Sequence, residues 1–292
     1  MSKVFLVTSS SRGLGRSIAE AVLEAGHQLV GTARTPSQLD DLVQKYGDRV
    51  RTVALDVTDP AAAEAAVAVA VDAFGRLDVV VNNAGYADLA SVEDITAEDF
   101  RAQLDTNLFG VVNVTKAALP VLREQGAGHI IQVSSVGGRL ATAGLSAYQS
   151  AKWAVGGFSS VLAQEVAPLG IKVTVLEPGG MRTDWAGSSM HIPPVSAPYE
   201  QTVGVFAKMT TTGTFTDGAA SDPAKVAQVV LQVAELAEPP LRLLLGSDAY
   251  LLATAAHRHL GEQDARWQQL SESTDHAEFT ADHLAALASR IS

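Results

Sequence analysis

A hydroxyl, a phenol and an ammonium lie close together in the sequence, in Ser135, Tyr148 and Lys152. Tyr148 and Lys152 have the i, i+4 spacing, so on a helix they share a face and lie one turn apart. Ser135 follows the apolar run 129–133, which is typical of a strand, and the end of a strand can place its hydroxyl beside the phenol. Together the three residues have the chemistry to move a proton to or from a substrate oxygen.

The expected electrostatic effect of Lys152 on Tyr148 is large. A phenol normally titrates near pH ~10. An ammonium at roughly 4 Å, in an effective dielectric of about 20, stabilises the phenolate by ~4 kcal/mol. That energy corresponds to a decrease of up to ~3 pKa units, so we expect the pKa of Tyr148 to lie near neutrality. Because a Tyr-x-x-x-Lys spacing alone is usually an ordinary surface pair, the interpretation depends on the segments around it.

Composition excludes several classes of function. The chain has 292 residues, is 47% hydrophobic and carries a net charge of −11, which argues against nucleic-acid binding. It has no cysteine, so disulfides, thiol nucleophiles and thiolate metal sites are excluded. His257 and His259 lack partners at metal-binding spacing, and we predict no metal site. The N-terminal apolar run is too short for a signal peptide, and no stretch reaches the ~18 apolar residues of a membrane span. We therefore expect a cytoplasmic protein without membrane partners.

The first thirty residues predict a nucleotide-binding βαβ unit. Residues 3–8 are β-branched and apolar, 9–15 form a small polar loop with two glycines, 16–25 have a helical pattern that ends at Gly26, and 28–32 form a second strand. Glycines in such a loop let the backbone approach a pyrophosphate, which binds at the helix N-terminus. The alternative is a plain strand-to-helix turn.

The motifs along residues 3–246 resemble those of the short-chain dehydrogenase/reductase family. Thr8, Gly13 and Gly15 match its T-G-x-x-x-G-x-G loop, and Ser9 stands where the family has its first glycine. Residues 82–85 read N-N-A-G, and 178–183 are similar to the family's P-G-x-x-x-T element. Ser135, Tyr148 and Lys152 fall on the family's spacing, and the motifs occur in the family's order.

The resemblance implies the roles of individual residues. The implied catalytic set is Asn107, Ser135, Tyr148 and Lys152, with Asn107 holding a water in a proton relay at a kinked helix. The implied substrate contacts are Ser135, Gly137, Leu145, Tyr148 and Trp185. The implied cofactor contacts are Thr8, Ser10, Ser11, Arg12, Gly13, Leu14, Gly15, Arg34, Asp56, Val57, Asn83, Ala84, Gly85, Tyr148, Lys152, Pro178, Gly179, Gly180, Met181 and Thr183.

The residues after the second strand favour NADP(H) over NAD(H). An NAD-binding fold of this kind carries an acid there for the ribose 2′-hydroxyl, but here the first acids are Asp40 and Asp41, in the next helical segment. Arg34 and Arg12 would instead bind a 2′-phosphate through their charge and planar fork. In the alternative, Arg34 is a solvated loop residue and both cofactors are tolerated. For Asp56, the alternative to an adenine contact is an N-cap of the helix near Pro60.

The alternation of strands and helices predicts an α/β fold, a doubly wound Rossmann-type parallel sheet of about seven strands with helices on both faces. We expect one dinucleotide-binding and catalytic domain over residues 1–246, followed by a helical C-terminal extension over 247–292. Residues 185–220 are long and weakly periodic, and we interpret them as a substrate lid with Trp185, Met190 and Phe206 as its apolar contacts. The strands are expected at 3–8, 28–32, 50–55, 77–81, 129–133, 171–176 and 239–246.

These features predict an oxidoreductase that transfers a hydride between NADP(H) and a carbonyl or secondary alcohol, with an apolar substrate favoured by the small apolar residues between 137 and 145. Two alternatives stay open: a non-catalytic NAD(P)-sensing protein on the same fold, and an isomerase or dehydratase that uses the same tyrosine. By analogy with the family we expect a homodimer or homotetramer that forms through the helices containing Asn107 and Tyr148.

Overall fold

The computed structural model describes residues 2–181, 190–214, 218–276 and 278–289. It divides into two compact units, Met1–Leu252 and Ala253–Ser292. The first unit therefore ends a few residues after the expected boundary at 246, because the first turn of the following helix belongs to it. That turn contacts Gly180, which follows the strand that ends at Pro178, because Asp248 Oδ2 accepts a hydrogen bond from the Gly180 N–H at 2.8 Å.

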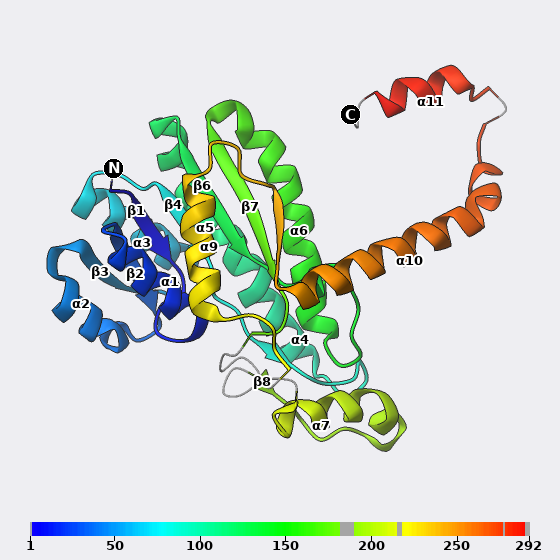
Figure 1. Ribbon diagram of the computed structural model, residues 1–292, viewed down its shortest axis with the longest axis horizontal. Coiled ribbons are helices and arrows are strands. Elements are labelled where there is room, and N and C mark those ends of the chain that lie inside the picture. The colour runs from blue at the N-terminus through cyan, green and yellow to red at the C-terminus, as the bar shows by residue number, and fades with distance from the viewer. Residues whose placement is uncertain (1, 182–189, 215–217, 277, 290–292) are drawn as a thin grey trace. The chain divides into compact units, whose positions relative to one another are not determined.

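A seven-stranded parallel sheet forms the centre of the first unit, as the sequence predicts (Figure 1). Its order is β3-β2-β1-β4-β6-β7-β9, so the direction of winding reverses between β1 and β4. Ligands of such sheets bind outside the carboxyl ends of the strands near this reversal. The strands are β1 Val4–Val7, β2 Gln28–Ala33, β3 Val50–Ala54, β4 Val79–Asn82, β6 Gly128–Val133, β7 Ile171–Pro178 and β9 Arg242–Leu245.

Helices cover both faces of the sheet because its central strands are apolar on both sides (Figure 1). In β1, Phe5 and Val7 pack against one layer and Val4 and Leu6 against the other. The first layer contains α1 Gly13–Glu24 and α9 Pro223–Glu235. The second contains α3 Pro60–Phe74, α5 Gly110–Gln125 and α6 Ser146–Val166. The remaining helices of this unit include α2 Asp40–Tyr46, α4 Ala97–Leu104 and α7 Val205–Thr211.

Local capping explains where α3 begins. The Asp59 side chain accepts a hydrogen bond from the Ala61 N–H at 2.9 Å, and Pro60 occupies the first turn, where no amide donor is needed. Asp56 instead accepts bonds from the Thr58 amide and hydroxyl. The alternative of an N-cap at Asp56 is therefore wrong, because the cap is three residues further along the chain, next to the proline.

The described part of the segment predicted as a lid contains several short elements. A two-residue parallel ladder joins β5 Ala87–Asp88 to β8 Met190–His191. Met190 and Phe206 pack against a small core of Leu89, Leu145, Val203 and Ala207.

The C-terminal helices are α10 Ser247–Glu272 and α11 Ala281–Ala288. Among the described residues, no helix has the length and apolarity needed to cross a membrane, and no group of three or more His, Cys, Asp or Glu side chains could hold a metal ion.

Candidate active site

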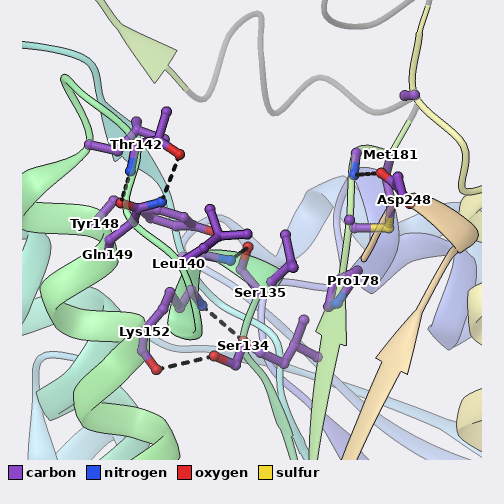
Figure 2. A pocket seen from close by; sticks show the side chains of 18 of the residues that line it. Ser134, Ser135, Leu140, Thr142, Tyr148, Gln149, Lys152, Pro178, Met181 and Asp248 are labelled. Atoms are coloured by element: carbon purple, nitrogen blue, oxygen red, sulfur yellow. Dashed lines mark hydrogen bonds between the residues drawn. The ribbon is translucent and has the colours of Figure 1, made fainter. Parts of the chain in front are cut away.

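A cavity of about 680 Å³ opens at the carboxyl ends of β1, β4, β6 and β7 (Figure 2). Most of the residues expected to bind cofactor or substrate line it. From the predicted sets these are Arg12, Gly13, Leu14, Asn83, Gly85, Ser135, Gly137, Leu145, Tyr148, Lys152, Pro178, Gly179, Gly180 and Met181. The structure therefore brings together residues from both ends of the predicted catalytic domain.

Ser135, Tyr148 and Lys152 meet on one side of this cavity (Figure 2). Ser135 follows β6, and the other two lie one turn apart in α6, as their spacing predicts. The Tyr148 side chain is buried, and only 4% of Lys152 is exposed. The Lys152 Nζ donates a hydrogen bond to the carbonyl oxygen of Val133 at 2.8 Å, so its position is fixed by the last residue of β6.

The expected pKa of Tyr148 near neutrality is wrong for this arrangement. Burial raises the pKa of Tyr148 to about 12, against the opposing effect of a hydrogen bond with Ser135. Burial also lowers the pKa of Lys152 to about 8. The Lys152 Nζ lies 5.6 Å from the centroid of the Tyr148 ring and donates to a backbone carbonyl. Removal of the phenolate from water therefore outweighs the attraction of the ammonium.

The Ser135 hydroxyl is oriented by the turn that follows it. Its Oγ accepts a hydrogen bond from the Gly137 N–H at 3.0 Å. A serine hydroxyl has one proton and two lone pairs, so this contact leaves the proton available for a second partner. The hydrogen bond between Ser135 and Tyr148 lowers the pKa of the phenol, as expected when the serine donates to the phenolic oxygen. A substrate oxygen beside Tyr148 would meet both hydroxyls.

Asn107 lies in a π-helix, Asp105–Phe109, between α4 and α5. Such insertions open the hydrogen-bond ladder of a helix and are frequent at functional sites, which agrees with the expectation of a kinked helix. The fully buried Asn107 side chain accepts a bond from the Tyr86 N–H at 3.0 Å and donates to the Tyr86 carbonyl at 2.8 Å. A Cβ on Gly85 would lie 2.5 Å from Asn107 Oδ1 and 3.6 Å from Lys152 Nζ. Gly85 thus separates the asparagine from the lysine.

The glycine loop keeps its turn although Ser9 replaces a glycine. Ser9 has a φ of 57°, in the left-handed region, and Gly13 has a φ of 55°. A Cβ on Gly15 would collide with the Ser9 carbonyl and the Asn83 side chain. Thr8 joins this loop to the N-N-A-G segment, because its Oγ1 accepts bonds from the Asn83 and Ala84 amides at 2.8 and 2.9 Å. The loop is therefore a backbone cradle that fits a dinucleotide pyrophosphate.

Replacement of Ser9 by glycine is expected to stabilise the protein. A residue with a Cβ pays roughly 1–2 kcal/mol in the left-handed region, and glycine pays about 0.5–1 kcal/mol more backbone entropy on folding. The free energy of unfolding of Ser9→Gly should therefore rise by up to about 1 kcal/mol in urea denaturation. Ser11→Gly is the matched control, since Ser11 has no positive φ, and it should be destabilising. Equal effects of the two variants would contradict strain at Ser9.

The predicted contacts for the adenosine half lie beyond this cavity. Arg34 follows β2 and is exposed, and Asp56 follows β3. Hydrogen bonds from Thr58 lower the pKa of Asp56, and the nearby charge of Arg34 adds to the shift. Asp41 is paired with Arg16 of α1, so this acid is directed to another partner. The other predicted contacts outside the cavity are Thr8, Ser10, Ser11, Gly15, Val57 and Ala84, and Thr183 and Trp185 lie outside the described residues.

The structure adds cavity residues that the motifs do not indicate. Thr142 and Gln149 hold each other through two hydrogen bonds, with the Thr142 N–H donating to Gln149 Oε1 at 2.8 Å. Asp248 and Leu252, in the first turns of α10, also line the cavity. The Gly180 amide and Asp248 are 68 residues apart in sequence. In the sequence, the one signal for Asp248 is its place in the first turn of a helix that begins after Gly246, which does not indicate its contact with Gly180.

The low pKa of Lys152 makes stability depend on pH. The folded protein releases this proton near pH 8, whereas the unfolded chain holds it until about pH 10.4. Between these values the unfolded state binds more protons, so the free energy of unfolding contributed by this group rises with pH. We expect wild type to gain stability relative to Lys152→Met between pH 7.5 and pH 9.5 in urea denaturation. A constant difference across that range would contradict the effect of burial on Lys152.

Comparison with known proteins places the chain in a family. A family model described as short chain dehydrogenase matches residues 3–191. The oxidoreductase BOA17 of Botryotinia fuckeliana is 57% identical over 93% of this chain and 98% of its own length. A short-chain dehydrogenase from Streptomyces avermitilis has a TM-score of 0.87 at 38% identity, over 94% of this chain and 98% of its own. An alcohol dehydrogenase from Thermococcus sibiricus, complexed with 5-hydroxy-NADP, has a TM-score of 0.69 at 27% identity, over 85% and 97% of the two chains.

The fold, the glycine cradle and these relatives define an oxidoreductase with a Rossmann-type dinucleotide-binding fold. The chain belongs to the short-chain dehydrogenase/reductase family, whose members bind NAD(H) or NADP(H) and act on small molecules. The glycine loop fits such a cofactor, because the missing Cβ of Gly15 lets the start of α1 pack closely against Ser9 and Asn83. This packing leaves Arg12, Gly13 and Leu14 in the lining of the cavity.

Proposed function

We propose that this protein is an NADP(H)-dependent reductase of an apolar carbonyl compound, with Tyr148 as the proton donor. The observation that carries the proposal is the Tyr148 phenol, which is buried and hydrogen-bonded to Ser135 in the lining of the cavity, where burial raises its pKa to about 12. At neutral pH this phenol holds its proton, which is the state that reduction requires. NADPH, when bound, supplies the hydride for the carbonyl carbon.

The residues of the chain supply position and the proton. When substrate binds, the single Ser135 proton would turn from the phenolic oxygen to the substrate oxygen and hold that oxygen beside Tyr148. As negative charge develops on that oxygen, the phenol transfers its proton to it. The Lys152 ammonium lies 5.6 Å from the ring centroid and would stabilise the phenolate that remains. Asn107 would tether the water through which the proton is replaced, at the opened turn of the π-helix.

Two arginines support a preference for NADP(H). Arg12 precedes α1 and lines the cavity, and Arg34 follows β2 at the same edge of the sheet. Asp41, the acid that could compete with a phosphate for this region, is paired with Arg16. The Thermococcus sibiricus alcohol dehydrogenase was solved with an NADP derivative, which is consistent with this preference.

Replacement of Arg34 by alanine is expected to reduce the preference for NADPH over NADH. Loss of a charge-assisted hydrogen bond of roughly 1.5–3 kcal/mol corresponds to about a 10- to 100-fold weaker NADPH affinity. NADH, which has no 2′-phosphate, should bind as before. Titration calorimetry with both cofactors measures the ratio of the Kd for NADH to the Kd for NADPH. Arg123→Ala, at the end of α5, is the control for loss of charge. An unchanged ratio would remove Arg34 from the phosphate site.

The cavity lining supports an apolar substrate. Its apolar side chains include Leu140, Leu145, Phe206, Met209 and Leu252. A panel of aliphatic and aromatic ketones and aldehydes, with NADPH oxidation followed by absorbance, tests the proposed activity. Turnover of the larger apolar members supports it. Tight NADPH binding without oxidation of any compound would instead favour the sensing protein.

The oligomeric state and the cytoplasmic location stay predictions. In support of the expected helix-mediated homodimer or homotetramer, three apolar side chains of the π-helix and α6 are exposed: Phe109, Trp153 and Val161.

A further inference from the structure

The segment from Val136 to Leu145 forms the wall of the cavity between Ser135 and Tyr148. It contributes Leu140 (Figure 2), Ala141 and Leu145 to the lining. Because it follows one hydroxyl of the site and precedes the other, a shift of this wall would move a bound substrate relative to both. The contacts that hold it therefore bear on the geometry of the reaction.

One of these contacts is an ion pair with a fully buried carboxylate. Arg139, in the first turn of the wall, places its Nη2 2.5 Å from Oε2 of Glu177. Glu177 is the penultimate residue of β7 and is 0% exposed. Its other oxygen, Oε1, accepts from Arg242 of β9, at 2.7 Å from Nη2 and 2.9 Å from Nε. Two guanidinium groups thus share one carboxylate, one from the wall and one from the sheet.

Two glycines leave space for this ion-pair arrangement. A Cβ on Gly156 of α6 would lie 2.5 Å from Arg242 Nη2, so the guanidinium occupies the space that a side chain would fill. A Cβ on Gly138 would lie 2.9 Å from the Lys152 carbonyl, which brings the first turn of the wall against the helix that carries the catalytic residues. The wall is thus held between α6 and β7.

An ion pair suits this position better than an apolar contact. Burial of a carboxylate is costly and is compensated only by well-placed partners, so the pair tolerates little displacement. Arg139 acts on Oε2 through its charge, at 2.5 Å, while Arg242 Nε donates a hydrogen bond to Oε1 and so fixes the direction of the carboxylate. The second half of the wall is held separately, through Thr142 with Gln149 and through the Ala90 N–H, which donates to the Gly144 carbonyl at 2.9 Å. Arg139 provides the charged anchor for the first half.

We infer that Glu177 is a positioning residue, which acts through Arg139 to set the distance between the substrate wall and Tyr148. The inference rests on the proposed carbonyl reduction for its effect on turnover. Arg139 does not line the cavity, so its replacement removes none of the lining side chains.

Replacement of the two arginines provides a matched test, because each variant removes one cation from the same carboxylate. Arg139→Met is expected to accelerate hydrogen exchange of the backbone amides between residues 136 and 145 about tenfold and to raise the KM for 9,10-phenanthrenequinone by a similar factor. The Kd for NADPH should stay at the wild-type value. Arg242→Met should lower the Tm comparably, but should leave both the exchange of the wall and the KM unchanged. Arg139→Lys, which keeps the charge, should have a KM between those of the wild type and Arg139→Met.

Equal changes of KM in the two methionine variants, or wild-type exchange of the wall in Arg139→Met, would overturn the inference. If Arg139→Met does not fold, Arg139→Lys against Arg242→Lys provides the same comparison. The exchange measurement needs no turnover. A wild-type protein that reduces no carbonyl compound would therefore refute the proposed function, while accelerated exchange in Arg139→Met would still support the anchoring of the wall.

Discussion

Replacement of Tyr148 by phenylalanine is expected to lower kcat for carbonyl reduction by about 10²- to 10⁴-fold, the usual contribution of a positioned acid or base. The phenol is the group expected to protonate the substrate oxygen, and the variant lacks only that hydroxyl. The buried ring in α6 remains, so the fold and the Kd for NADPH should be retained. Steady-state NADPH oxidation and fluorescence titration with NADPH measure the two quantities.

The physical basis of this expectation is the protonation state of the phenol. Burial raises the pKa of Tyr148 to about 12, so the phenol is neutral at physiological pH. The substrate oxygen that gains charge during reduction is a much stronger base, close to hydroxide, whose conjugate acid has a pKa of ~15.7. Proton transfer from the phenol is therefore downhill. Tyr199→Phe is the matched control, since its hydroxyl donates to Glu93 on the surface at 2.8 Å. Wild-type turnover in Tyr148→Phe would refute the assignment.

Replacement of Gly15 by alanine is expected to weaken NADPH binding at least about tenfold and to lower the free energy of unfolding by roughly 1–3 kcal/mol, the usual cost of an overpacked site. The added methyl group would collide with the Ser9 carbonyl and with the Asn83 side chain. A backbone carbonyl cannot rotate away as a flexible side chain can, so the loop itself must move. The pyrophosphate cradle would then lose its shape.

The control for this change is Gly157→Ala in α6, where a Cβ meets no atom within 4 Å. Alanine has the higher helix propensity, so this variant should gain up to about 1 kcal/mol of stability. Urea denaturation and titration calorimetry with NADPH provide both readouts. Unchanged NADPH affinity in a folded Gly15→Ala protein would show that the cradle does not bind the dinucleotide.

The sequence alone determined the fold class and most of the candidate site. Apolar runs such as residues 3–8 and 171–176 predict strands buried on both faces, and these strands form the parallel sheet. The spacing of Tyr148 and Lys152 requires a shared helix face, which any α-helix imposes. Chemical identity and local geometry carry this information, so it can be predicted without the tertiary structure.

The tertiary structure alone decided how the site behaves. Burial determines that the pKa of Tyr148 rises and that of Lys152 falls, and burial depends on every element around α6. The left-handed backbone of Ser9 is imposed by its neighbours, against its own preference. The contacts of Glu177 with Arg139 and Arg242, and of Asp248 with Gly180, join segments that are distant in sequence. No local pattern encodes them, because each exists only after the sheet has brought its carboxyl ends to one edge.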